Sequence, residues 1–114
     1  MKHVFFVPER GDIVRISLSP LEGRGPDIGR RPAVVLSPQA YNARVGLAVL
    51  CPIVRLAKGY PFEVPLPPDF PITGVILADQ AMCLDWRAHR AEKIGSLPSG
   101  AVQEALGKLR AILS

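Results

Sequence analysis

Pro32-Ala-Val-Val-Leu-Ser-Pro38 is the stretch of this sequence that decides its fold. Its four consecutive apolar residues, two of them β-branched, are typical of a strand buried on both faces. Residues 22–31, directly before it, contain three glycines and three arginines without apolar periodicity, which indicates a loop. A polar loop that enters a rigid core strand is a common way to build a functional site. Arg31 lies at this junction, where its guanidinium can serve such a site.

Further short strands are expected on both sides of this stretch. Residues 11–18 alternate between apolar and polar side chains, as a half-buried strand does. Other buried or irregular strands are expected over residues 47–54, 60–66, 74–79 and 86–94. Residues 39–44 are expected to be a connector. Pro52 predicts a bulge or an edge position, because proline cannot donate to a strand ladder.

The chain is expected to end in a helix. After Pro98, which suits a first helical turn, apolar residues recur at intervals of four, three and four, which gives one apolar stripe: Val102, Leu106, Leu109 and Leu113. These elements predict a mainly β fold with helices (α+β), in the form of a small, curled antiparallel sheet or partial barrel with a C-terminal helix. At this length, residues 1–114 are expected to form a single domain.

Composition narrows the cellular setting. The net charge of +4 permits an anionic partner, such as nucleic acid or an acidic peptide. No window reaches the roughly 18 apolar residues of a membrane span, and the apolar run at the N-terminus is shorter than that of a signal peptide. We therefore expect a cytoplasmic protein without membrane association.

The cysteines and histidines suggest no metal chemistry. Cys51 and Cys83 both lie in apolar surroundings and are expected to be buried, reduced thiols. His3 and His89 are isolated in the sequence. Since none of the four has metal-ligand spacing, the sequence predicts no bound metal and no cofactor.

Arginine on loops beside a rigid sheet is the chemistry that remains. The sequence has no nucleophile elbow, no P-loop and no paired-histidine motif. A guanidinium presents a planar fork that matches phosphate oxygens. Structural roles stay open at this point: Arg31 can pair with Asp12 or Asp79, and Gln80 can cap a strand end.

Other candidate side chains also have ordinary interpretations. Arg24 and Arg30 can be solvated loop charges. Tyr60, Phe62 and Trp86 can pack in the core, although an aromatic ring near a groove can also stack on a base.

Several motifs in register nevertheless resemble those of the MazF/PemK family of toxin endoribonucleases. They cover nearly the whole chain and comprise Gly11-Asp-Ile-Val14, the glycine-rich loop, Arg31-Pro-Ala-Val-Val-Leu-Ser-Pro38, Lys58-Gly-Tyr-Pro-Phe-Glu-Val64, Leu77-Ala-Asp-Gln80 and Trp86-Arg-Ala88. The resemblance implies an SH3-like, strongly curled sheet and a homodimer. It further implies sequence-specific, metal-independent cleavage of single-stranded mRNA, and an acidic cognate antitoxin that blocks the RNA groove.

The resemblance also assigns roles to individual residues. Arg31 is expected to be the catalytic arginine. The residues expected to contact RNA are Arg24, Asp27, Arg30, Ser37, Lys58 and Gln80. The family usually carries a threonine or serine hydroxyl where this sequence has Val54. We expect Arg55 to supply the missing contact, with Ser37 and Thr73 as alternatives.

The expected reaction is attack of a ribose 2′-hydroxyl on the adjacent phosphate, which yields a cyclic phosphate and a free 5′-hydroxyl. A guanidinium fixed near the phosphate would stabilise the extra negative charge of the transition state by roughly 3–4 kcal/mol. Because the pKa of arginine is above about 12, charge stabilisation suits Arg31 better than general-base catalysis.

Two other functions remain possible on the same small sheet. The protein can be a toxin that binds a protein target such as DNA gyrase, although such a toxin does not need the Arg31-Pro32 motif or two basic loops. It can also be a relative that binds RNA or antitoxin with weakened catalysis, an alternative that Val54 supports.

Overall fold

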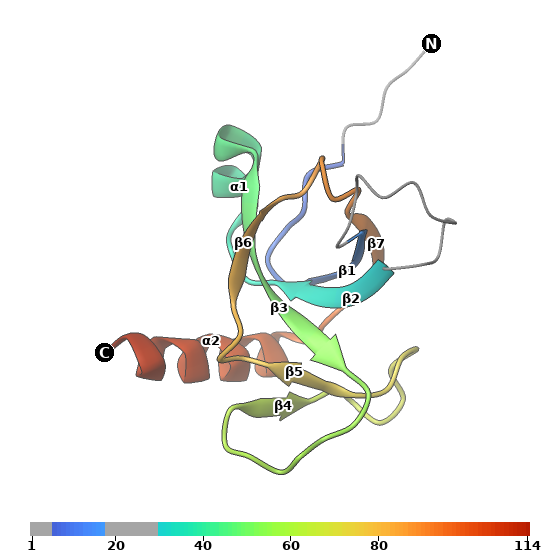
Figure 1. Ribbon diagram of the computed structural model, residues 1–114, viewed down its shortest axis with the longest axis vertical. Coiled ribbons are helices and arrows are strands. Elements are labelled where there is room, and N and C mark those ends of the chain that lie inside the picture. Colours follow the sequence, from blue (N-terminus) through green and yellow to red (C-terminus); the bar gives the residue numbers. More distant parts are fainter. Residues whose placement is uncertain (1–5, 18–29) are drawn as a thin grey trace.

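The computed structural model of the chain describes residues 6–17 and 30–114 (Figure 1). Its elements follow one another in this order: β1 (Asp12–Ser17), β2 (Arg30–Val35), α1 (Gln39–Val45), β3 (Leu47–Val54), β4 (Glu63–Pro65), β5 (Val75–Leu77), β6 (Met82–Asp85), β7 (Glu92–Ser96) and α2 (Ser99–Leu113). Residues 32–35 belong to β2, and residues 36–38 lead from it into α1.

The strands form one antiparallel sheet in the order β4-β5-β3-β2-β1-β7, with β6 also paired to β3. Strand β3 is the longest and changes partner along its length: Leu47–Leu50 pairs with β6, whereas Ile53 and Val54 pair with β5. Pro52 lies between these two segments, so its missing N–H falls near the point where the partner changes. The sheet stays open, and the predicted mainly β fold with helices is confirmed.

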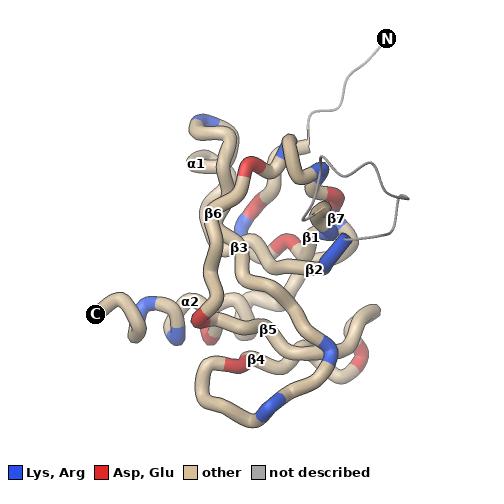
Figure 2. Tube along the Cα trace, viewed as in Figure 1, with Lys and Arg blue, Asp and Glu red and all other residues tan. Residues whose placement is uncertain are grey.

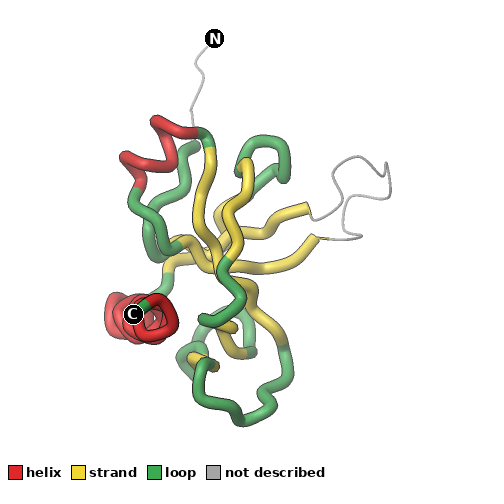
Figure 3. The backbone as a smooth tube through the Cα atoms, turned by 60° about the vertical axis from the view of Figure 1, so that its left-hand side comes forward, coloured by secondary structure: helices red, strands yellow, loops and turns green. Residues whose placement is uncertain are grey.

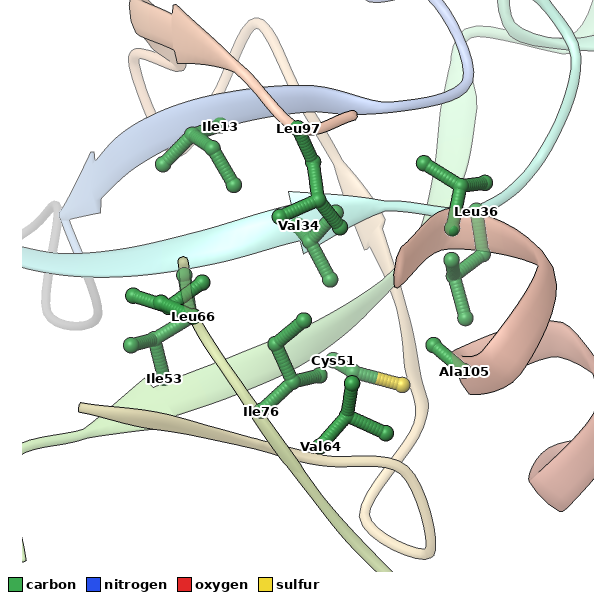
Figure 4. Packing of buried hydrophobic residues seen from close by; sticks show 11 residues of the cluster. Ile13, Val34, Leu36, Cys51, Ile53, Val64, Leu66, Ile76, Leu97 and Ala105 are labelled. Atoms are coloured by element: carbon green, nitrogen blue, oxygen red, sulfur yellow. The ribbon is translucent and has the colours of Figure 1, made fainter. Parts of the chain in front are cut away.

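The apolar runs are buried because both faces of the central strands are covered. Neighbouring residues of β2 enter different clusters, Val34 on one face and Val35 on the other. Figure 4 shows the first cluster, which residues of β1, β2, β3, β4, β5 and α2 form together with the residues that directly follow β2, β4 and β7: Ile13, Val34, Leu36, Cys51, Ile53, Val64, Leu66, Ile76, Leu97, Val102 and Ala105. The second cluster consists of Val14, Ile16, Ala33, Val35, Ala48, Leu50 and Trp86. The core position predicted for Trp86 is therefore confirmed.

Helix α2 covers one side of the sheet and is seen nearly end-on beside the strands in Figure 3. Val102 and Ala105 are buried, and Leu106 and Leu109 pack partly against the first cluster. Leu113, the last member of the predicted stripe, is 77% exposed because the helix runs past the edge of that cluster. No helix within residues 6–17 and 30–114 has the length and apolar character needed to cross a bilayer.

The structure corrects the predicted connector over residues 39–44, which is the helix α1. Pro38 precedes its first turn, and Gly46 ends it in a left-handed conformation (φ 83°) with its N–H donated to the Asn42 carbonyl. This pairing of an initial proline with a terminal glycine is a helix signal that the apolar pattern did not carry. The buried Asn42 side chain fixes the helix through bonds to Pro8 and Ser37.

The strand predicted over residues 86–94 begins later in the structure. Asp85 accepts hydrogen bonds from the main-chain N–H groups of Arg87 and Ala88, which folds this segment into turns. Strand β7 begins only at Glu92. The polar side chains of the segment therefore belong mostly to a turn and not to a strand face.

The two thiols have different environments, so the prediction that both are buried is wrong for Cys83. Cys51 is buried in the first cluster, and burial, with a contribution from the charge of Asp79, raises the pKa of its thiol to about 12. Cys83 is exposed on β6. Both cysteines are free.

Candidate active site

A groove of about 970 Å³ lies where the start of β2, the end of β3 and the loops around β4 and β5 meet. Four of the predicted site residues line it: Arg31, Arg55, Lys58 and Gln80. Figure 2 shows the basic residues at the start of β2 and in the loop that follows β3. Residues distant in the sequence therefore contribute to one basic site.

Strand pairing positions Arg31. It pairs with Ile16 of β1, and Ala33 pairs with Pro52 of β3. Arg31 lies two residues before this pair on β2 and Val54 two residues after it on β3, and both line the groove. The Arg31 side chain is exposed at the end of a strand whose other end is buried core.

Arg31 has no ion pair within the described ranges, 6–17 and 30–114. The carboxylates proposed as its structural partners are bound elsewhere. Asp12 contacts Lys93 Nζ at 3.2 Å and accepts the Glu9 N–H. Asp79 accepts a hydrogen bond from the Tyr60 hydroxyl at 2.9 Å. Neither Asp12 nor Asp79 therefore pairs with the Arg31 guanidinium, and neither prevents it from binding an anionic ligand.

Arg30 has the opposite environment, and the structure does not bring it to the groove. Its side chain is 13% exposed and donates to the Ser17 hydroxyl at 3.1 Å and the Arg15 carbonyl at 3.2 Å. It also contacts the Arg90 carbonyl and the Glu92 carboxylate. These bonds join β2, β1 and β7, so the structure supports a structural role for Arg30, whereas its contact with RNA stays a prediction.

The loop between β3 and β4 supplies Arg55 and Lys58, both exposed. The Glu63 carboxylate holds the turn of this loop, because its two oxygens accept the main-chain N–H groups of Lys58 at 2.8 Å and Gly59 at 3.0 Å. Gly59 has a φ of 86°, a left-handed conformation that glycine adopts without strain. Glu63 lines the groove but was not among the residues predicted from the sequence.

Val54 has a hydroxyl-bearing neighbour in the loop that leads into β5. Gly74 lies so close to the end of β3 that an added Cβ would be 2.2 Å from the Val54 carbonyl oxygen. This contact brings the preceding residue, Thr73, into the groove wall. Thr73 and Arg55 thus both remain candidates for the contact that Val54 cannot make.

Ser37, by contrast, has a structural environment, and its contact with RNA stays a prediction. Its buried hydroxyl donates to the Asn42 side chain at 2.6 Å and accepts the Val49 N–H at 2.8 Å. It does not line the groove.

Tyr60 and Gln80 also line the groove. The hydrogen bond to Asp79, together with burial, raises the pKa of the Tyr60 hydroxyl above its ordinary value. Tyr60 is half-buried, and its hydroxyl donates a hydrogen bond to the exposed Asp79, so its side chain lines the groove and is not part of the core. The main-chain N–H of Gln80 closes a turn to Leu77, while its side chain is exposed at the groove.

Two predicted RNA contacts, Arg24 and Asp27, lie outside the described residues, as does His3. Within the part of the chain that the structure describes, no group of three or more His, Cys, Asp or Glu side chains could hold a metal ion.

Comparison with known proteins points to one family. Residues 9–113 match the family described as PemK-like, MazF-like toxin of type II toxin-antitoxin system. The chain is 38% identical over 108 residues to the endoribonuclease toxin MazF of Escherichia coli K12, covering 95% of this chain and 96% of that protein. It is 37% identical over 109 residues to the endoribonuclease toxin ChpB of the same strain, covering 92% and 93% of the two chains.

Solved structures give the same result. A MazE–MazF crystal structure from Deinococcus radiodurans superposes with a TM-score of 0.86 at 44% sequence identity, covering 96% of this chain and 98% of that one. A crystal structure of MazF from the same organism superposes with a TM-score of 0.84 at the same identity and coverage.

Proposed function

This chain belongs to the PemK-like, MazF-like toxin family of type II toxin–antitoxin systems, and we propose that it is an endoribonuclease toxin that cuts single-stranded mRNA in the groove beside Arg31. The observation that carries the proposal is the convergence of Arg31, Arg55 and Lys58 on one groove. Within residues 6–17 and 30–114, no ion pair neutralises these three cations. An RNA backbone supplies the regularly spaced phosphates that such a surface would bind.

The reaction proposed is an internal transfer of the phosphoryl group. The ribose 2′-oxygen forms a bond to phosphorus, the bond from phosphorus to the 5′-oxygen breaks, and the products are a 2′,3′-cyclic phosphate and a 5′-hydroxyl. The 2′-hydroxyl loses its proton, and the leaving oxygen gains one. Arg31 stabilises the added negative charge on the phosphate oxygens. Arg55, next to Val54, would contact the same phosphate.

We assign base selection to two further residues of the groove lining. Gln80 offers both a donor and an acceptor to a base edge, and Tyr60 offers an aromatic edge beside it. Unstacked bases of single-stranded RNA can reach such groups, whereas bases in an A-form duplex are much less accessible.

The partners proposed are those of a toxin of this family. A second copy of the chain would form a homodimer. An acidic antitoxin would cover the same basic groove and compete with RNA, since charge complementarity favours that pairing. The structural relatives include MazE–MazF assemblies, which supports an antitoxin partner. Action on translated mRNA would take place in the cytoplasm.

The test is cleavage of a long, mixed-sequence single-stranded RNA by purified protein in the presence of EDTA. We expect cuts at a short recurring sequence, with fragments that carry a cyclic phosphate at one end and a 5′-hydroxyl at the other. RNA that is bound but never cut would refute the enzyme and favour a relative without catalysis. Absence of both binding and cleavage would refute the RNA proposal itself.

A further inference from the structure

We infer that Glu63 is a positioning residue, which holds the loop from Arg55 to Gly59 in the shape that presents its basic side chains to RNA phosphates. The inference rests on the proposed function. Glu63 lines the groove beside three cations but directs its carboxylate to the main chain of the loop.

The bonding geometry explains how one side chain can set the shape of the loop. Each Glu63 oxygen accepts one N–H, from Lys58 at 2.8 Å and from Gly59 at 3.0 Å. Successive N–H groups at a left-handed residue form a concavity that binds anions, and Gly59 supplies the left-handed conformation. The Glu63 carboxylate fills this concavity from within the same chain.

Glu63 is itself firmly anchored. Its main chain pairs with Leu77 of β5, and its N–H donates to the Tyr60 carbonyl at 3.2 Å. From the other side, Lys108 of α2 donates to the Pro61 carbonyl. The Glu63 carboxylate, whose main chain is fixed by strand pairing, therefore stabilises the neighbouring loop from Arg55 to Gly59 by hydrogen bonds.

The arrangement also has an electrostatic consequence. A carboxylate in a basic groove would ordinarily pair with a cation and reduce its attraction for phosphate. Both Glu63 oxygens are instead occupied by N–H groups, and in the described residues Glu63 forms no ion pair with Arg55 or Lys58. Both cations thus stay available for charge-assisted bonds to RNA.

Asp85 provides a matched control. Its carboxylate also accepts two main-chain N–H groups, from Arg87 at 3.0 Å and Ala88 at 2.9 Å, but in a turn that does not line the groove. Glu63→Ala should lower kcat/KM for a single-site RNA oligonucleotide about tenfold, the scale expected when charge-assisted hydrogen bonds are lost. Glu63→Gln should lower it less, because the amide keeps one acceptor. Asp85→Ala should change it less than threefold.

A double-mutant cycle separates positioning from general destabilisation. If Glu63 acts through the loop, Glu63→Ala should have little further effect once Arg55 and Lys58 are both alanine. Independent, multiplicative effects on kcat/KM would overturn the inference.

A second measurement does not depend on activity. Hydrogen exchange of the Lys58 and Gly59 amides should accelerate at least tenfold in Glu63→Ala and stay unchanged in Asp85→Ala. Unchanged exchange in Glu63→Ala would overturn the inference even in an active enzyme. A wild-type protein that cuts no RNA would instead refute the proposed function, while the exchange result would still decide whether Glu63 holds the loop.

Discussion

Arg30 and Arg31 are adjacent and chemically identical, yet the structure predicts opposite effects for their removal. Arg31 is exposed at the groove and has no ion pair among the described side chains. Arg31→Ala should therefore change the free energy of unfolding by less than about 0.5 kcal/mol, as most surface substitutions do. Its turnover of RNA should fall about 100- to 1,000-fold, the usual loss when one charge-stabilising donor is removed.

The cost of Arg30→Ala can be worked out from its contacts. The bonds to Ser17 and the Arg15 carbonyl are partly buried and should contribute about 1 kcal/mol each. The contacts with the Arg90 carbonyl and Glu92 are exposed and should add little. The total of about 2 kcal/mol should lower Tm by roughly 8 °C in a domain of this size.

The assay compares urea unfolding, thermal unfolding and RNA cleavage for both variants, with cleavage measured well below the lower Tm. Arg30→Ala should keep kcat/KM within about threefold of wild type, because its side chain does not line the groove. The reasoning is refuted if Arg30→Ala loses turnover as Arg31→Ala does without losing stability. It is equally refuted if Arg31→Ala remains fully active.

Two further matched pairs test the groove and the core. Gly59 and Gly46 have φ values of 86° and 83°, with open space at the Cβ position, so alanine at either should cost roughly 1–2 kcal/mol of unfolding free energy. Only Gly59→Ala should impair RNA cleavage. Equal impairment by Gly46→Ala would contradict a role for the loop. At pH 8 a thiol reagent should label Cys83 and spare Cys51, because Cys51 is buried and a pKa of about 12 leaves only about one Cys51 in ten thousand as thiolate. The labelling is read by mass spectrometry. Labelling of both thiols in the folded protein would contradict the burial of Cys51.

Much of the sheet could be predicted from the sequence because its signals are local. The Ala33–Leu36 run is apolar at every position, and the structure accounts for this by packing alternate residues into two different clusters. The family, which several motifs in register indicated, is confirmed by the comparisons. Helix α1 could not be predicted from apolar periodicity because it has only seven residues and its one buried side chain is the polar Asn42.

The positions of the two cysteines show where local patterns stop being informative. Both have apolar neighbours in the sequence, but Cys51 pairs with Val34 in the centre of β3 and is buried in the first cluster, whereas Cys83 is exposed on β6, whose one partner strand among the described residues is β3. Whether a residue in a strand is covered depends on which strands flank it and on what packs over its face. That arrangement involves residues far apart in the chain, so no short window contains it.

The site follows the same logic in its charges. Their loop positions and the family resemblance made Arg30, Arg31, Arg55 and Lys58 candidates, but attraction for phosphate depends on which of these cations the fold has already paired. A shift of one position along β2 separates an arginine bonded to β1 and β7 from one open to the groove. Likewise, a count of charges would take Glu63 as neutralising a cation, yet its carboxylate bonds to two main-chain N–H groups and forms no ion pair with Arg55 or Lys58 among the described residues. Strand register and loop hydrogen bonds therefore decide which cations of the groove are already paired within the described part of the chain, which net charge alone does not reveal.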